Sequence, residues 1–319
     1  MKQKPCKLFS NAKINLTLDI TGTDGGYHTL DSLAVEIDLG NQIEAVKTRD
    51  GEISIEFDGN EYEIPSVPAN ETNAYKAAKL FADTFHTGGA KITVYSVIPV
   101  GAGLGSSSAD AAGVLRAMRQ LYLKETTPET EEKILKIADM TGSDTRMMYL
   151  GGAVRMKGRG DVAESLPLPP SRAKEKKGLF SFFRKEDKRM KEDKRMMYFL
   201  LICPLTPVST PQCFCKYDEL EKTYPPRTQD ATERFLKGDV YGLGRLMKND
   251  LQEAACALNP DVKNALDAAR KLMPIGLTMT GSGSTVVAMF DTAEKRRYAL
   301  EQCRKWQNNY WVIDADSVF

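Results

Sequence analysis

The chain of 319 residues contains few of the side chains that bind structural metals or form disulfides. It has two histidines, His28 and His86, and six cysteines that are scattered without a C-x-x-C pair. Structural zinc sites are built from closely spaced cysteines and histidines, so we predict no metal site and expect free thiols. A chain of this length can bury a core in each of two domains without such staples.

Long hydrophobic runs are also missing. No segment approaches the roughly 20 apolar residues that cross a bilayer. The basic residues 1–5 lead into a strand-like pattern and not into the apolar core of a signal peptide. We therefore expect a cytoplasmic protein that has no membrane partner.

An excess of positive charge is confined to one segment. The formal net charge is +1, but residues 171–196 hold 11 Lys/Arg against 5 Asp/Glu, so the remainder carries −5. Nucleic-acid binding requires a basic surface, and we expect no nucleic-acid partner. The segment repeats residues 185–190 as 191–196, which predicts a solvated insertion. Its apolar cluster at residues 179–183 leaves a lesser alternative, contact with a membrane surface or a partner.

The spacing of apolar residues predicts a mixed fold. Period-two alternation indicates strands at residues 12–20, 33–37 and 53–57, and helical spacing follows at residues 73–84. Residues after 198 predict a strand, several helices, two strands about a second glycine turn, a helix and a last strand. This order is typical of an α+β domain with an antiparallel sheet.

Between a strand expected at residues 91–98 and a helix expected at 109–123 lies a loop with three alternate glycines. Glycine lets a backbone turn sharply beside an anion, and serines before a helix supply capping hydroxyls. The helix start adds unpaired N–H groups and a positive dipole end, so we predict a phosphate site. The residues assigned to ATP binding are Pro99, Gly101, Ala102, Gly103, Leu104, Gly105, Ser106, Ser107 and Ser108.

Other phosphate motifs do not fit this loop. No lysine follows Gly105, as a P-loop would require, and the third glycine comes one residue too early for a dinucleotide fingerprint. A tight strand-to-helix connection that binds nothing is the remaining alternative.

Residues 99–112 resemble the P-x-G-x-G-L-G-S-S motif of the GHMP kinases, a superfamily of small-molecule kinases. Residues 12–16, 24–30 and 279–284 resemble signatures of the branch that acts on cytidine diphosphate-linked methylerythritol. The resemblance implies an α+β, two-domain GHMP kinase fold. Its parts would be an N-terminal mixed βαβ nucleotide-binding domain over residues 1–166, the basic insertion over 167–197 and a C-terminal ferredoxin-like domain over 198–319.

The resemblance also implies an activity, the ATP-dependent phosphorylation of the substrate's 2-hydroxyl group in isoprenoid precursor synthesis. Asp144 matches the catalytic aspartate that accepts the hydroxyl proton, and Lys13 matches the lysine beside it. A lysine stabilises the ionised carboxylate and adds positive charge where the phosphoryl group moves. ATP and magnesium are the implied cofactors, and we expect a bacterial-type cytoplasmic enzyme that is a monomer or weak homodimer.

Substrate contacts are implied in the same way. Tyr27 and Phe214 match rings that sandwich cytosine, while His28 and Asn15 match residues near the base and the erythritol. The other matched residues are Thr210, in the segment of Phe214, and Gly281, Ser282 and Gly283, beside the substrate phosphates. Without the resemblance, Asp144 reads as an ordinary helix N-cap and Lys13 as a solvent-facing strand residue.

One departure leaves alternatives open. The family continues from its aspartate with Val-Pro-Phe-Phe, whereas Asp144 is followed here by Thr145, Arg146, Met147 and Met148. Arg146 is close enough in sequence to pair with Asp144 or to reach a phosphate. The alternatives are another GHMP kinase with a sugar, homoserine or mevalonate substrate, or a non-catalytic GHMP-fold protein that binds a nucleotide or metabolite.

Overall fold

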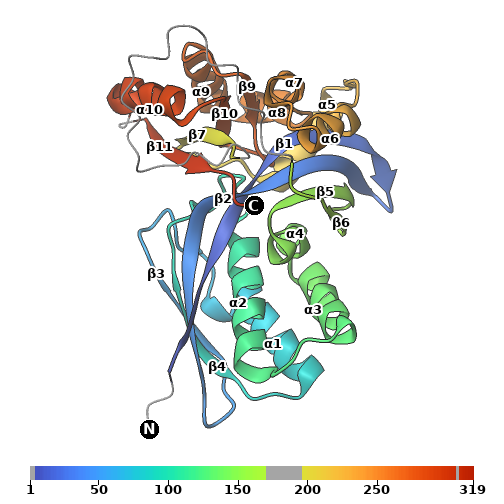
Figure 1. Ribbon diagram of the computed structural model, residues 1–319, viewed down its shortest axis with the longest axis vertical. Coiled ribbons are helices and arrows are strands. Elements are labelled where there is room, and N and C mark those ends of the chain that lie inside the picture. The colour runs from blue at the N-terminus through green and yellow to red at the C-terminus, as the bar shows by residue number, and fades with distance from the viewer. Residues whose placement is uncertain (1–3, 170–195, 307–308) are drawn as a thin grey trace, which may run out of the picture.

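The computed structural model describes residues 4–169, 196–306 and 309–319. Nearly all of the predicted insertion, with its repeat and its apolar cluster, lies outside the described residues. The described chain forms a four-stranded sheet, at the upper end of the molecule in Figure 1, and a seven-stranded sheet that extends from the lower end to beside it.

The seven-stranded sheet is built around one long antiparallel hairpin. Its central strands are β1 (Cys6–Asp24) and β2 (Tyr27–Lys47), joined by Gly25 and Gly26 at φ 55° and 81°. Positive φ at both central residues is what a type I′ hairpin turn needs, and glycine adopts it without strain. The sheet has the order β3-β4-β2-β1-β8, and β5 pairs with β2 and β6. The other strands are β3 (Ser54–Asp58), β4 (Ala90–Tyr95), β5 (Ala153–Gly158), β6 (Val162–Ser165) and β8 (Lys248–Asn249).

The predicted strands in this sheet are confirmed, but β1 and β2 are longer than predicted. Register shifts near Asn11, Asn15 and Ile20 interrupt the alternation on which the prediction relied. Such bulges bend a strand while it stays paired. The hairpin therefore extends from one end of the molecule to the other (Figure 1).

Four helices cover one face of the hairpin's lower half (Figure 1). They are α1 (Asn73–Phe85), α2 (Ser106–Tyr122), α3 (Pro128–Thr141) and α4 (Thr145–Leu150). Helix α2 lies closest to the sheet, because Gly113 brings its backbone against β1 and β2. A Cβ atom there would lie 2.7 Å from Ile43 and 2.8 Å from Ser10. A short 3-10 turn, Ala69–Glu71, precedes α1.

The four-stranded sheet is antiparallel, in the order β11-β7-β10-β9. Its strands are β7 (Tyr198–Pro204), β9 (Gly276–Met279), β10 (Val286–Phe290) and β11 (Tyr310–Asp316). The helices around it are α5 (Thr210–Glu219), α6 (Thr228–Leu236), α7 (Val240–Leu246), α8 (Gln252–Leu258), α9 (Pro260–Arg270) and α10 (Ala293–Gln302), with a 3-10 turn at Cys303–Trp306. The predicted antiparallel α+β organisation is confirmed.

The described residues link the two sheets at several points, including the C-terminus and β8. The C-terminal residues follow β2, where Val318 N–H donates to the Glu36 carbonyl at 2.9 Å. Strand β8, from the second half of the chain, pairs in parallel with β1. The predicted domain limits stay a prediction. None of the helices in the described ranges is long and apolar enough to cross a membrane.

Candidate active site

The predicted phosphate loop connects β4 to α2. Gly101, Gly103 and Gly105 have φ of 69°, 79° and 77°, the left-handed region that glycine tolerates. Pro99 is buried just before them. The first hydrogen bond of α2 runs from Ala109 N–H to the Gly105 carbonyl at 2.8 Å. The N–H groups of residues 106–108 therefore begin the helix ahead of any intrahelical bond, which is the arrangement that binds anions.

The serines do not have the predicted capping role. Helix α2 begins at Ser106, and its N-cap is Gly105, which has no side chain to cap with. The left-handed turn at Gly105 already directs the chain into the helix, so the serines occupy its first turn. Ser106 Oγ donates to the Ile98 carbonyl at 3.2 Å, and Ser107 Oγ accepts from Asn73 at 2.8 Å. The hydroxyls hold neighbouring segments in place, and the backbone presents the N–H groups.

The second glycine turn packs directly on the phosphate loop. Thr285 N–H donates to the Ala102 carbonyl at 3.1 Å. A Cβ atom on Gly103 would lie 2.3 Å from the Thr280 carbonyl, and one on Gly281 would lie 2.9 Å from the Gly103 carbonyl. Glycine is required at both positions because two backbones touch there.

Lys13 and Asp144 meet beside this loop, as the resemblance implied. Lys13 Nζ lies 3.2 Å from Asp144 Oδ2, although 131 positions separate them in the sequence. Lys13 is 3% exposed, so it is not the solvent-facing residue that a lone strand pattern suggests. Its backbone N–H donates to the Leu104 carbonyl at 3.2 Å, and its Cε is 3.4 Å from where a Gly105 Cβ would be. The charged pair thus adjoins the start of α2.

Asp144 stands at the N-cap position of α4 but makes no side-chain cap. Its carboxylate points to Lys13 instead and keeps 25% of its side chain exposed. Arg146, the main departure from the family pattern, does not pair with Asp144. It forms a two-pronged ion pair with Asp139, with distances of 2.7 Å and 2.6 Å. The carboxylate of Asp144 is therefore left to Lys13 and to solvent.

Asn15 links the charged pair to the second glycine turn. Its Oδ1 accepts from Lys13 Nζ at 2.7 Å and from Gly281 N–H at 3.0 Å. Its backbone N–H donates to Thr280 Oγ1 at 2.9 Å, and its Nδ2 donates to Ser32 at 2.8 Å. Sequence reasoning missed Thr280, although it directly precedes the glycine motif. We call residues 99–108, Lys13, Asn15, Asp144 and residues 280–283 the loop side of the site.

The remaining predicted residues lie at the tip of the β1–β2 hairpin and on α5. The rings of His28 and Phe214 stack with centroids 5.0 Å apart and an interplanar angle of 14°. His28 Nε2 lies 3.2 Å from Asp218, also on α5. Thr210, at the start of α5, shares a hydrogen bond of 2.6 Å with Ser282. We call the hairpin tip, residues 20–28, together with α5 the hairpin side.

Tyr27 is placed differently from His28. It is 65% exposed, and the guanidinium of Arg159 lies 4.7 Å from its ring centre. The structure thus stacks His28, and not Tyr27, on Phe214. Whether cytosine lies between Tyr27 and Phe214 stays a prediction. Arg159 was not predicted, since it lies in the turn between β5 and β6, far from the hairpin in sequence.

A cavity of about 460 Å³ opens beside His28 on the hairpin side. Ile20 to Thr23 of β1 line one wall, and Tyr217, Asp218 and the residues after α5 line the other. The hairpin side therefore combines an aromatic surface with open space, whereas the loop side is a set of closely bonded backbones.

Comparison with known proteins identifies the family. Residues 72–152 match the GHMP kinase N-terminal domain, and residues 231–309 match the GHMP kinase C-terminal domain. The chain is 30% identical to 4-diphosphocytidyl-2-C-methyl-D-erythritol kinase of Clostridium beijerinckii, over 96% of this chain and 98% of the relative. It is 31% identical to the kinase of the same name from Paramagnetospirillum magneticum, over 95% of each.

Solved structures show the same fold. A crystal structure of 4-(cytidine 5'-diphospho)-2C-methyl-D-erythritol kinase matches with a TM-score of 0.73 at 24% identity, covering 98% of this chain and 100% of that one. Mevalonate kinase of Methanococcus jannaschii matches with a TM-score of 0.66 at 18% identity, over the full length of both chains. With the relatives at 30% and 31% identity over nearly their whole length, the chain belongs to the 4-diphosphocytidyl-2-C-methyl-D-erythritol kinase family of the GHMP kinases.

Proposed function

We propose that the protein transfers the γ-phosphoryl group of ATP to the 2-hydroxyl group of 4-diphosphocytidyl-2-C-methyl-D-erythritol. One observation carries the proposal: the Lys13–Asp144 pair, 3.2 Å apart, lies beside the glycine loop at the start of α2. A carboxylate, a lysine and an anion-binding helix start are the parts that phosphoryl transfer to an alcohol needs. Relatives named for this substrate match almost the entire chain.

The loop side would hold the triphosphate of ATP. The N–H groups of residues 106–108 and the positive end of α2 attract the phosphate oxygens. The contacts of Gly103 with Thr280 and Gly281 fix the backbone of the loop before ATP arrives. A rigid, correctly oriented donor set lowers the barrier because it need not reorganise during the reaction.

The chemical step uses Asp144 as proton acceptor. The substrate hydroxyl gives its proton to the Asp144 carboxylate while its oxygen attacks the γ-phosphorus. The bond from the γ-phosphorus to the bridging oxygen breaks, and ADP leaves. Lys13 supplies positive charge next to the phosphoryl group throughout, and Asn15 holds its ammonium group at 2.7 Å. Since Arg146 is bound to Asp139, it does not neutralise the acceptor.

Magnesium fits this site as a companion of ATP. Among the residues that the structure describes, no three His, Cys, Asp or Glu side chains converge to hold a metal ion. Mg²⁺ at nucleotide sites commonly keeps several waters and binds to substrate phosphates with one or two carboxylates. Asp144 is the carboxylate next to the phosphate loop, and the ion when bound would neutralise phosphate charge.

The hairpin side would recognise the cytidine end of the substrate. His28 and Phe214 form an aromatic surface next to an open cavity, and base stacking on such rings supplies affinity. Thr210 and Ser282, bonded to each other at 2.6 Å, connect this side to the second glycine turn, where the diphosphate would pass.

Substitution of Asp144 by Asn tests the chemical step. Asn cannot accept the hydroxyl proton, so we expect ADP release with ATP and the cytidylyl substrate to fall by about 10²–10⁴-fold. The thermal unfolding temperature should change little, because the Asn amide oxygen can still accept from the buried Lys13, which also donates to Asn15. The matched control is Asp83→Asn, an exposed carboxylate on α1 whose side chain is 65% accessible. Retained activity in Asp144→Asn would refute the assigned role.

A substrate panel tests the identity of the acceptor. The cytidylyl compound, mevalonate, homoserine and galactose are compared under one coupled ADP assay. We expect kcat/KM to be highest for the cytidylyl compound. If only another of these alcohols is phosphorylated, the protein has a different GHMP kinase activity. If calorimetry detects nucleotide binding but no alcohol is phosphorylated, the protein is a binding protein.

A further inference from the structure

Residues 248–250 form a short connector that the active-site motifs do not include. It follows α7 and runs along β1 as β8, with Lys248 opposite Thr17 and Asn249 opposite Leu18. Asp250 N–H extends the contact by donating to the Leu18 carbonyl at 3.0 Å. The connector is therefore fixed to the strand that carries Lys13 and Asn15.

Asn249 reaches from this connector to the second glycine turn. Its Nδ2 donates to the carbonyls of Met279 at 2.9 Å and Gly281 at 2.8 Å, and its Oδ1 accepts from Leu251 N–H at 2.9 Å. The side chain is 6% exposed. Both donors of the amide and its oxygen are engaged, so the orientation of Asn249 is fully determined.

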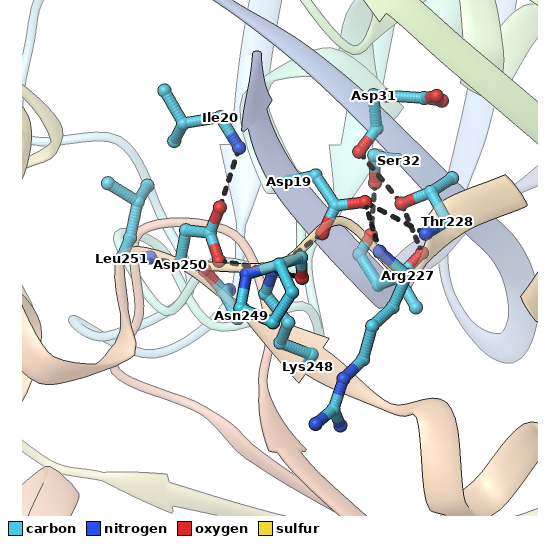
Figure 2. Close-up of polar contacts among 12 residues, drawn as sticks. Asp19, Ile20, Asp31, Ser32, Arg227, Thr228, Lys248, Asn249, Asp250 and Leu251 are labelled. Atoms are coloured by element: carbon cyan, nitrogen blue, oxygen red, sulfur yellow. Dashed lines mark hydrogen bonds and ion pairs between the residues drawn. The ribbon is translucent and has the colours of Figure 1, made fainter. Parts of the chain in front are cut away.

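Lys248 and Asp250, the chain neighbours of Asn249, form an ion-pair cluster with Asp19 (Figure 2). Lys248 Nζ lies 2.9 Å from Asp19 and 2.8 Å from Asp250, and both carboxylates are 2% exposed. Asp19 Oδ2 also accepts the N–H groups of Arg227 and Thr228, each at 2.8 Å. Figure 2 shows that the carboxylates of Asp19 and Asp250 link β1, the start of α6 and the connector.

Hydrogen bonds through Gly281 and Asn15 link the connector to the Lys13–Asp144 pair. Gly281, whose carbonyl Asn249 holds, donates its N–H to Asn15 Oδ1 at 3.0 Å. The same oxygen accepts from Lys13 Nζ at 2.7 Å. The Gly281 backbone also touches Gly103 so closely that no Cβ fits between them. A shift of residues 280–283 would therefore disturb both the ammonium of Lys13 and the phosphate loop.

We propose that Asn249, held by the Asp19–Lys248–Asp250 cluster, is a positioning residue that keeps the second glycine turn in register with Lys13 and the phosphate loop. The kinetic part of this proposal rests on the proposed kinase function. Asn249 touches no reacting atom in this scheme, so removing it should lower kcat more than it changes KM.

The first test compares Asn249→Ala and Asn249→Asp with matched variants of Asn259. Asn259 has similar chemistry away from this connector: it is 9% exposed, its Nδ2 donates to the Thr206 carbonyl at 3.0 Å and its Oδ1 accepts from Asp261 N–H at 3.0 Å. Because loss of these bonds would let residues 280–283 shift beside Lys13 and the phosphate loop, we expect kcat to fall by about 10–30-fold. We expect KM for ATP and for the cytidylyl substrate to stay within about 3-fold. The Asn259 variants should unfold at similarly lowered temperatures but keep kcat.

Asn249→Asp keeps the size and the bond to Leu251, so it tests the same contacts if the alanine variant fails to fold. Its carboxylate would face two carbonyl oxygens, and we expect a larger fall in kcat than for alanine. If the Asn249 variants and the Asn259 variants lose the same amount of stability and also the same amount of activity, the proposal is overturned.

The second test needs no turnover. Hydrogen exchange of the amides at residues 280–285 is measured in the free protein. We expect exchange to become about 10-fold faster in the Asn249 variants and to stay unchanged in the Asn259 variants. Unchanged exchange in the Asn249 variants would overturn the proposal. If the wild-type protein shows no turnover but hydrogen exchange is faster in the Asn249 variants, the proposed function is refuted and the positioning role of Asn249 is supported.

Discussion

The loop side of the site is more tightly packed than the hairpin side. On the loop side, Lys13 is 3% exposed, and the glycine backbones at 103 and 281 touch. On the hairpin side, Tyr27 is 65% exposed, and His28 makes its contacts across to α5 next to a cavity of about 460 Å³. One side is locked by buried backbone contacts, and the other is held by a few side chains near solvent.

This difference fits the two tasks of a small-molecule kinase. Phosphoryl transfer depends on alignment, and a misplacement of about 1 Å can cost 10²-fold in rate, so the loop side benefits from a fixed backbone. Recognition of a base by stacking tolerates side-chain adjustment, and rotamer changes at binding surfaces are common. Variants of the loop side should therefore affect kcat, and variants of the hairpin side should affect KM.

After Asp144→Asn, the largest expected effect on the loop side comes from Lys13→Met. Met keeps much of the length and the apolar stem but removes the charge beside Asp144, so we expect kcat to fall by about 10²–10³-fold. KM for the cytidylyl substrate should change far less. Steady-state kinetics measure both, and Lys7→Met, an exposed lysine on the same strand, is the matched control. A large rise in KM with normal kcat would break the comparison.

The next effect concerns stability and pH, through Asp110 in α2. Burial raises the pKa of Asp110 to about 7, although the hydrogen bond from Asn41 opposes the shift. The folded protein then holds a proton that the unfolded chain releases at lower pH. The free energy of unfolding should therefore fall as pH rises from about 4 to 7, by at most about 1.4 kcal/mol per pH unit, and then level off.

Asp110→Asn checks this pH dependence. Asn stays neutral at every pH, and its Oδ1 can still accept the hydrogen bond from Asn41. Asn41 itself accepts the N–H groups of Val97 and Ile98 ahead of the phosphate loop, so this contact is kept. Denaturant unfolding at pH 5 and pH 8 should show the variant gaining stability over the wild type at the higher pH. Parallel pH profiles of the two proteins would contradict the assignment.

The smallest expected effect is that of Phe214→Ala on the hairpin side. Loss of a stacking ring costs about 1–3 kcal/mol of base affinity, so KM for the cytidylyl substrate should rise by roughly 10-fold or more. We expect kcat to stay near normal, because Lys13 and Asp144 are untouched. Tyr298→Ala removes a ring that is 66% exposed on α10 and serves as control. A fall in kcat alone would remove the distinction between the two sides.

Much of the fold and the phosphate loop was predictable from local sequence. The glycines at 101, 103 and 105, between a period-two strand and an alanine-rich helix, predict the turn that the structure shows. The start of the helix was misplaced by three residues, since Gly105 takes the N-cap position and Ser106 is already helical. Strand lengths were underestimated where bulges interrupt the alternation of β1.

The charged pair was predictable only through resemblance to a family. Neither Lys13 nor Asp144 stands out in its own segment, and their contact joins β1 to the start of α4. Arg146 illustrates the limit: sequence proximity suggests Asp144, yet α3 offers Asp139 in a two-pronged geometry. The contacts of Asn249 and Thr280 could not be predicted locally, because their partners lie up to 265 positions away.

The sequence by itself determined the turns, the helix and strand periods and the left-handed glycine turn of the phosphate loop, since these depend on neighbouring residues and on backbone sterics. Only the tertiary structure decided that Lys13 is buried against Asp144, that Arg146 turns to Asp139 and that Asn249 holds the second glycine turn. Those pairings depend on which distant elements pack together, because an ion pair or hydrogen bond forms only where packing brings its two partners within about 3 Å.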